Sequence, residues 1–210
     1  MQNDTLTKFL VRVIAIILCF PIHESAHAWV AAKLGDPTGR NAGRISLNPV
    51  VHMDMWGTLC FLFLGIGYAR PVPVNIGNFR RPKAGFALTA LAGPVSNLIM
   101  AFLCLLVLRI FLQGGASAGF VDYLYTGLIY AAYINVSLAV FNMIPIPPLD
   151  GSRLVTAVLP DRLYGLFLKY ERYSAFALLI LLFIMNRAGV SPVSAVSGAF
   201  FGSLARLAGL

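Results

Sequence analysis

Two histidines and a glutamate stand close together near the start of the chain, in the stretch LCFPIHESAHAWV that covers residues 18–30. His23 and His27 are four residues apart, so on a helix their side chains lie on one face, one above the other. The pattern His-Glu-x-x-His is typical of zinc hydrolases, in which two neutral imidazoles bind Zn²⁺ and the glutamate moves protons to and from water. The spacing therefore predicts His23 and His27 as metal ligands and Glu24 as a catalytic acid/base.

The apolar surroundings of this motif strengthen the prediction. An ionisable side chain at bilayer depth costs on the order of 2.5–3.5 kcal/mol on insertion scales. The chain has only three histidines and eight acidic residues, and three of these eleven side chains fall within five positions of an apolar segment. Shared ligation of a metal ion would offset the loss of their hydration.

A catalytic zinc ion takes three protein ligands and a water molecule, so a third ligand is needed. Asp150 and His52 are the candidates. Asp150 follows the uncharged run 124–149, where an acidic group again needs a partner, and we expect it at the depth of the His-Glu-His segment. His52 lies in a polar loop with Asp54, where a hydrogen-bonding role at the membrane interface would explain it as well. We favour Asp150 and keep His52 as the alternative.

The composition predicts that a membrane positions these residues. The chain of 210 residues is 59% hydrophobic and 11% charged, with a mean hydropathy of +0.80, whereas soluble domains have roughly 25% charged residues. Residues 84–108 and 124–149 contain no charge, and about 20 apolar residues suffice for a crossing helix. We therefore expect an all-α polytopic membrane protein that forms a single domain over residues 1–210. Its motif core lies at about 9–160 and its C-terminal helices at about 163–210.

Apolar and polar segments alternate along the chain and predict four to six transmembrane or re-entrant helices. We expect the first helix to be retained rather than cleaved as a signal peptide, since Arg12 and Pro21 interrupt its apolar run. Polar residues between the first two apolar segments predict a loop or short strand. The apolar segments are 9–32, the short 57–68, 84–112, 124–144, 174–185 and 190–210.

The chain has a net charge of +8. Its basic residues lie mostly between the apolar segments, notably Arg70, Arg80, Arg81 and Lys83. This distribution is typical of cytoplasmic loops under the positive-inside rule and does not favour nucleic-acid binding. No Lys or Arg lies between residues 109 and 153, so we expect the loop at 113–123 to face away from the cytoplasm. The metal site then lies between helices near the cytoplasmic side. The three cysteines have neither disulfide nor CxxC spacing and are expected to be free thiols.

Three motifs together resemble the site-2 protease family of intramembrane zinc metalloproteases. They are HESAH at 23–27, AGPVSN at 92–97 and NMIPIPPLDG at 142–151, and the intervening GRISLNPVVHMD and RPVPVN resemble the small bacterial and archaeal members. The resemblance implies a multi-pass protein of the prokaryotic cell membrane that binds one zinc ion. It also implies hydrolysis of transmembrane substrate proteins, often in regulated proteolysis that releases a signalling fragment. No PDZ-like or CBS-like stretch is visible.

Carried over by position, the resemblance implies that His23, His27 and Asp150 are zinc ligands and Glu24 the catalytic acid/base. It further implies that Asn142 and Asn97 steady the substrate or the developing oxyanion. Without the resemblance, an asparagine in a membrane helix more often bonds a neighbouring helix.

Two other functions stay open at this point. A membrane metal transporter could use the same ligands as a transit site, although transporters usually show an internal repeat and the motif has no second copy here. A non-catalytic membrane-binding relative would be expected to lack Glu24, which is present.

Overall fold

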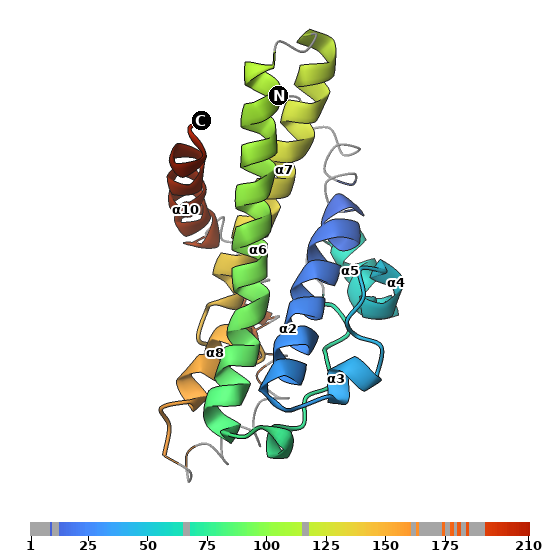
Figure 1. Ribbon diagram of the computed structural model, residues 1–210, viewed down its shortest axis with the longest axis vertical. Coiled ribbons are helices and arrows are strands. Elements are labelled where there is room, and N and C mark those ends of the chain that lie inside the picture. The colour runs from blue at the N-terminus through green and yellow to red at the C-terminus, as the bar shows by residue number, and fades with distance from the viewer. Residues whose placement is uncertain are drawn as a thin grey trace.

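The computed structural model of the chain describes residues 9, 13–64, 68–114, 118–160, 163, 174, 177, 178, 180, 181, 184 and 192–210. Within these residues the regular elements are all helices and no strand occurs, which confirms the predicted all-α class. Figure 1 shows an elongated bundle in which the long helix α6 packs against both α2 and α7. Helix α8 packs near the beginning of α6, and α10 packs on α6 and α7 near its far end.

The described elements range from single helical turns to a helix of 32 residues. In chain order they are η1 (Ala15–Cys19, a π turn), α2 (Phe20–Leu34), α3 (Thr38–Asn41), α4 (Pro49–His52), α5 (Met55–Leu64), η2 (Ile76–Asn78), α6 (Pro82–Gln113), α7 (Ala118–Asn142), α8 (Asp150–Thr156) and α10 (Pro192–Ala208).

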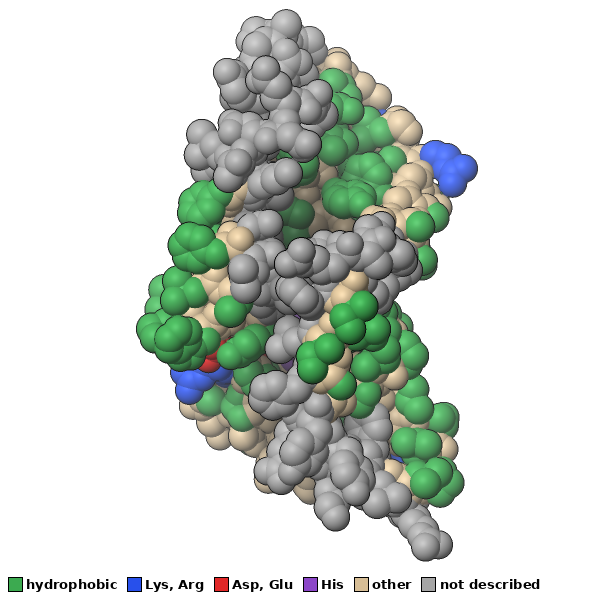
Figure 2. All heavy atoms as spheres, turned by 180° about the vertical axis from the view of Figure 1, so that it is seen from behind, with side chains coloured by type: hydrophobic (Ala, Val, Ile, Leu, Met, Phe, Trp, Pro, Cys, Tyr) green, Lys and Arg blue, Asp and Glu red, His purple; other side chains and the backbone are tan. Residues whose placement is uncertain are grey.

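Two of the described helices are long and apolar enough to cross a membrane: α6 over its whole length, and the part of α7 from Leu124 to Asn142. Apolar residues on the outer side of α6 are exposed at spacings of three or four, so one stripe of the helix faces outward. Figure 2 shows hydrophobic side chains over much of the described surface on one face, with Lys and Arg in a few separate places. The expected total of four to six spans stays a prediction, and half of the segment 174–185 lies outside the described residues.

The polar connection between α2 and α5 contains two single helical turns, α3 and α4, where we expected loop or short strand. Local capping explains both turns. The Asp36 side chain accepts hydrogen bonds from the backbone and hydroxyl of Thr38, at 3.1 and 2.5 Å, at the start of α3. The Asn48 side chain accepts from Val50 N at 3.0 Å, and Pro49 fills the first position of α4.

Asp36 also holds the end of α2 against the segment that leads into α6. Its carboxylate accepts from Asn75 N and from the Asn78 side chain, both at 2.8 Å. Burial by itself would raise the pKa of Asp36, but these hydrogen bonds and those from Thr38 lower it below its ordinary value. The ionised carboxylate therefore stabilises this junction.

Helices α2 and α6 run antiparallel, and the buried stripe of α6 changes partner along its length. Near the beginning of α6, Phe86 clusters with Ala31 of α2. Two turns beyond the middle, Leu105 clusters with Ala132 and Val136 of α7. The stripe therefore faces α2 first and α7 later, and the candidate site lies along the first part.

Candidate metal centre

His23, His27 and Asp150 are brought together although 127 positions separate the first from the last. His23 Nε2 lies 3.1 Å and His27 Nε2 3.2 Å from the same atom, Asp150 Oδ2. One ligand atom from each side chain lies within 4.8 Å of the others, and all three residues are buried. His52 is not part of this group, so of the two candidate third ligands only Asp150 lies with the histidines.

Helix α6 fixes the ring of His27. His27 Nδ1 donates a hydrogen bond of 2.7 Å to the carbonyl oxygen of Thr89. This bond sets the tautomer and leaves Nε2 with its lone pair directed at the group of ligands, as in most metal-binding histidines.

Gly93 allows α6 to approach both imidazoles. A Cβ atom at this position would lie 2.5 Å from His23 Cε1, His27 Cε1 and His27 Nε2. Real Cβ atoms are essentially never so close to other atoms, so the glycine of the AGPVSN motif is required by this packing. The next residue, Pro94, has no N–H and cannot bond the carbonyl of Ala90, which loosens α6 at the same level.

Asp150 owes its position to the tight connection between α7 and α8. It is the first residue of α8, and seven residues separate it from Asn142, where α7 ends. A Cβ atom on Gly151 would lie 2.2 Å from the carbonyl oxygen of Met143, so only glycine allows α8 to begin this close to α7. The LDG sequence is thus explained by the same kind of close approach as Gly93.

The neighbours of Asp150 favour its charged form. Arg153 lies one turn further along α8, with Nη1 3.9 Å from Asp150 Oδ1. A carboxylate and two neutral imidazoles form the donor set that zinc prefers.

The spacing of the three side chains also suits a zinc ion. Zinc bonds of about 2.0 Å in tetrahedral geometry separate the ligand atoms by about 3.3 Å. The two separations from Asp150 Oδ2, 3.1 and 3.2 Å, are close to that value. Zinc fits these side chains, with the His27–Thr89 hydrogen bond as outer support.

Glu24 is half-buried on α2, next to His23 in sequence. Within the described residues no hydrogen bond holds its carboxylate. Asn97 is fully buried on α6, one turn beyond Gly93. Asn142 is half-buried at the end of α7, and its amide donates to the Leu138 carbonyl at 3.0 Å. Neither asparagine is bonded to the three candidate ligands.

The sequence reasoning missed a group of polar residues that anchors the connection from α3 to α4. Ser25, the third residue of HESAH, donates to the Ser46 carbonyl at 2.5 Å and accepts from Ser46 N at 3.1 Å. His52 Nε2 donates to the same carbonyl at 2.7 Å. His52 therefore has a positioning role in this part of the structure.

Arg44 joins two chain segments beside α2. Its guanidinium is buried and donates to the carbonyls of Val51, Arg70 and Pro71, at 2.5, 3.0 and 2.6 Å. Burial and the nearby Arg70 lower the pKa of Arg44, which nevertheless stays charged as arginines do. A buried arginine bonding only backbone carbonyls leaves no pattern that spacing could show.

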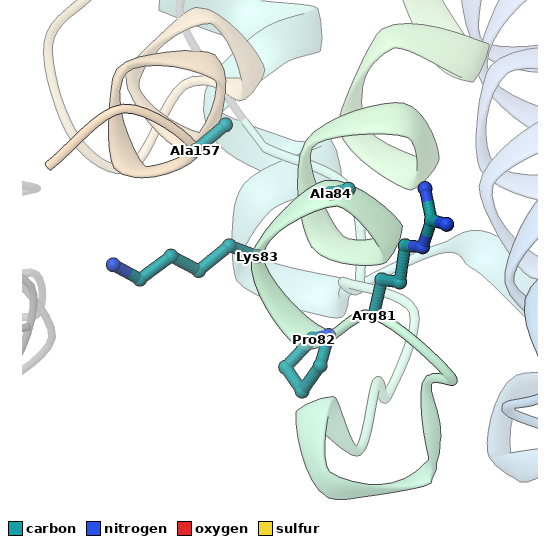
Figure 3. A pocket seen from close by; sticks show the side chains of 5 residues that line it. All are labelled: Arg81, Pro82, Lys83, Ala84 and Ala157. Carbon is teal, nitrogen blue, oxygen red and sulfur yellow. The ribbon is translucent and has the colours of Figure 1, made fainter.

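A hollow on the surface lies away from this centre, where α6 begins beside the end of α8. It is lined by Arg81, Pro82, Lys83, Ala84 and Ala157. Figure 3 shows that the two basic side chains point away from each other. Lys83 Nζ donates to the Leu159 carbonyl at 2.6 Å, so it serves to hold the end of α8.

Comparison with known proteins relates the chain to metallopeptidases. The model of "Peptidase family M50" matches residues 116–185. A Bacillus subtilis protein named "Putative zinc metalloprotease YwhC" is 39% identical over 171 residues, which cover 80% of this chain and 78% of the relative. A Methanocaldococcus jannaschii protein named "Putative zinc metalloprotease MJ0611" is 31% identical over 154 residues, which cover 73% of this chain and 73% of the relative. A Mycolicibacterium smegmatis protein named "Putative zinc metalloprotease Rip2" is 28% identical over 148 residues, which cover 68% of this chain and 55% of the relative. No solved structure matches the chain significantly.

Proposed function

The chain belongs to peptidase family M50 and is a zinc metallopeptidase, and on this premise we propose that it hydrolyses peptide bonds of membrane-spanning substrate proteins. Membership in the family confirms the resemblance found in the motifs, the enzyme class and the zinc cofactor. Members of this family are membrane proteins, in agreement with the two long apolar helices. We further propose a multi-pass protein of the prokaryotic cell membrane, built as one domain.

The observation that carries the proposal is the convergence of His23, His27 and Asp150 at the packed junction of α2, α6 and α8. We assign these three side chains as the zinc ligands. When bound, zinc polarises the scissile carbonyl and makes water nucleophilic near neutral pH. Glu24, adjacent to the first ligand, accepts the proton of the attacking water and passes it to the leaving amine.

The length of α6 supports a site near one membrane boundary. Its 32 residues span about 48 Å at 1.5 Å per residue, against about 30 Å for the hydrocarbon core. Gly93, which touches the histidines, lies 16 residues before Arg109, or about 24 Å along the axis. With Arg109 at one boundary, the metal centre lies close to the other, on the side of Lys83. We propose that this side is cytoplasmic and that water reaches the site from it.

Asn97 and Asn142 are proposed as polar groups that steady the reacting peptide. Asn142 ends α7 just before the chain turns toward Asp150, so it lies on the approach to the site. Substrate helices must unwind before cleavage, because an intact helix hides its carbonyls in its own hydrogen bonds. The turn at 143–149, with its three prolines, presents non-helical backbone beside the ligands.

The first experiment measures zinc per chain in detergent-purified protein, with Asp150→Ala and His52→Ala as a matched pair. We expect about one tightly held zinc in the parent and in His52→Ala, and weakened retention in Asp150→Ala, because a catalytic site needs three protein ligands. Equal retention in Asp150→Ala and the parent would remove Asp150 from the site.

The second experiment tests the chemistry with a membrane-spanning reporter substrate in proteoliposomes. Glu24→Gln keeps the shape of the side chain but cannot accept a proton, so we expect zinc content to stay at the parental value and cleavage to fall by about 10²–10⁴-fold. Undiminished cleavage by Glu24→Gln would overturn its assignment. Zinc uptake into the vesicles without any cleavage would favour a transporter instead.

A further inference from the structure

Buried polar atoms without partners gather where α2, α6 and α7 meet. Among the described residues, both side-chain amide atoms of Asn97 and the Oδ1 atom of Asn135 have no hydrogen-bond partner. The exposed fractions of these residues are 0% and 1%, so bulk water does not reach them. A buried polar group left without a hydrogen bond costs about 1–3 kcal/mol, and the cost is high in the low dielectric of a membrane protein.

The helix packing brings these two amides to the same level of the bundle. Gly93 of α6 contacts His23 of α2, and the two helices are antiparallel. Asn97 lies one turn after Gly93 on α6. Cys19 lies one turn before His23, at the end of η1. Asn135 of α7 reaches this level as well, because its Nδ2 donates to Cys19 Sγ at 3.2 Å. Three helices thus each contribute one buried polar side chain to one place.

The backbone beside this place departs from a regular α-helix. The π turn η1 (Ala15–Cys19) ends here, and Pro21, which has no N–H, follows two residues later. π turns are frequent at functional sites, where they widen a helix locally.

We propose that one or two ordered water molecules bind between Asn97 and Asn135, at a place that we call the Asn97–Asn135 water site. Buried waters typically make about three hydrogen bonds to polar groups that lack other partners. Asn97 Nδ2 donates to the water, and the two Oδ1 atoms accept from it. These three atoms satisfy that requirement.

The water site lies about one helical turn, or about 5.4 Å along α2, from His23. His23 Nδ1 is itself buried without a partner among the described residues, so hydration extends toward the metal centre. The role of this water rests on the proposed function: the site would hold water on the bilayer side of the metal centre, where hydrolysis consumes it. The presence of the water itself does not depend on that function.

Hydroxyl-radical labelling by brief X-ray irradiation tests the water site, because radicals form from bound water and oxidise the nearest sulfur. The chain supplies a control: Cys19 is fully buried, whereas Cys104 on α6 is half-buried and packs against the apolar α6–α7 cluster. We expect Cys19 in the detergent-purified, zinc-loaded chain to be oxidised several-fold faster than Cys104, against the order of their exposure. Oxidation of Cys19 no faster than that of Cys104 would overturn the proposal.

Removing the amides tests the position of the water. Asn97→Leu replaces the amide by an apolar group of similar size, and we expect it to lower the rate at Cys19 several-fold and to leave Cys104 unchanged. Asn135→Leu should act in the same way and serves where Asn97→Leu fails to fold. An unchanged Cys19 rate in a folded variant would refute the site. Because labelling needs no substrate, its outcome is separate from that of the cleavage assay.

Discussion

The close contact of α6 with both histidines predicts a strong effect of a single methyl group. In Gly93→Ala, the new Cβ would lie 2.5 Å from His23 Cε1 and from two atoms of the His27 ring. Non-bonded carbon atoms stand about 3.5–4.0 Å apart, so the rings or α6 must move by about 1 Å. Metal ligands must keep their distances within about 0.2 Å, so a displacement of this size disrupts the site.

The expected result is a loss of zinc affinity of at least about 10–100-fold, the range seen when only the outer support of a metal ligand is lost. Overpacking should also lower the free energy of unfolding by about 1–3 kcal/mol. The assay is a competition titration of the purified chain with a chromogenic zinc chelator, together with thermal unfolding in the presence of chelator. Unfolding of the metal-free protein shows whether the variant still folds.

Gly127→Ala is the matched control, because a Cβ at Gly127 in α7 would meet no atom of the described residues within 4 Å. Alanine is favoured over glycine inside a helix by up to about 1 kcal/mol, so this variant should bind zinc as the parent does and unfold at the same or a higher temperature. If Gly93→Ala folds and binds zinc as tightly as the parent, the assignment of His23 and His27, which Gly93 contacts, as zinc ligands is wrong.

Two further predictions concern the residues around the centre. Ser25→Ala removes both hydrogen bonds to Ser46 at a cost of about 1–3 kcal/mol; we expect KM for the reporter to rise more than kcat falls and zinc content to stay at the parental value. Ser25→Thr should restore KM, and an unchanged KM in the alanine variant would show that this anchor does not serve the substrate. Asp36 has a lowered pKa in the fold, so the stability that it adds is complete above its unfolded pKa of about 3.9 and is lost as pH falls through the lower folded value. The difference in unfolding temperature between parent and Asp36→Asn, measured in chelator, should therefore be largest near neutral pH and narrow below about pH 4; a constant difference would contradict it.

The sequence allowed the candidate ligands to be predicted from two patterns, a helical spacing and the length of an uncharged run. The helical spacing places His23 and His27 on one face, and the length of the uncharged run 124–149 places Asp150 at a comparable depth. The long helices α6 and α7 followed from apolar length alone. The short turns α3 and α4 have only four residues each, too few to show a helical period. The bonds of Asp36 and Asn48 that start them lie in a polar, Gly- and Pro-rich stretch whose composition is typical of a loop.

Other features depend on contacts that have no sequence pattern. Ser25 bonds the backbone of Ser46, and Arg44 bonds three carbonyls in two segments. Carbonyl groups are the same in every residue, so nothing in the letters shows which carbonyl a side chain will reach. The clustering of Asn97 and Asn135 likewise depends on the antiparallel register of α2 and α6, which only the structure provides.

The bonds of Arg44 have a consequence for how this protein can diverge. Its guanidinium is directed at main-chain oxygens, so the side chains at Val51 and Arg70 can change during evolution without loss of these bonds. Lysine at position 44 could not replace the planar guanidinium of Arg44, since a single ammonium cannot reach three oxygens in the same geometry. A library randomised at 51 and 70 should therefore yield many active sequences, whereas one randomised at 44 should return arginine. The loops beside the centre are in this way open to new substrates while their backbone path stays the same.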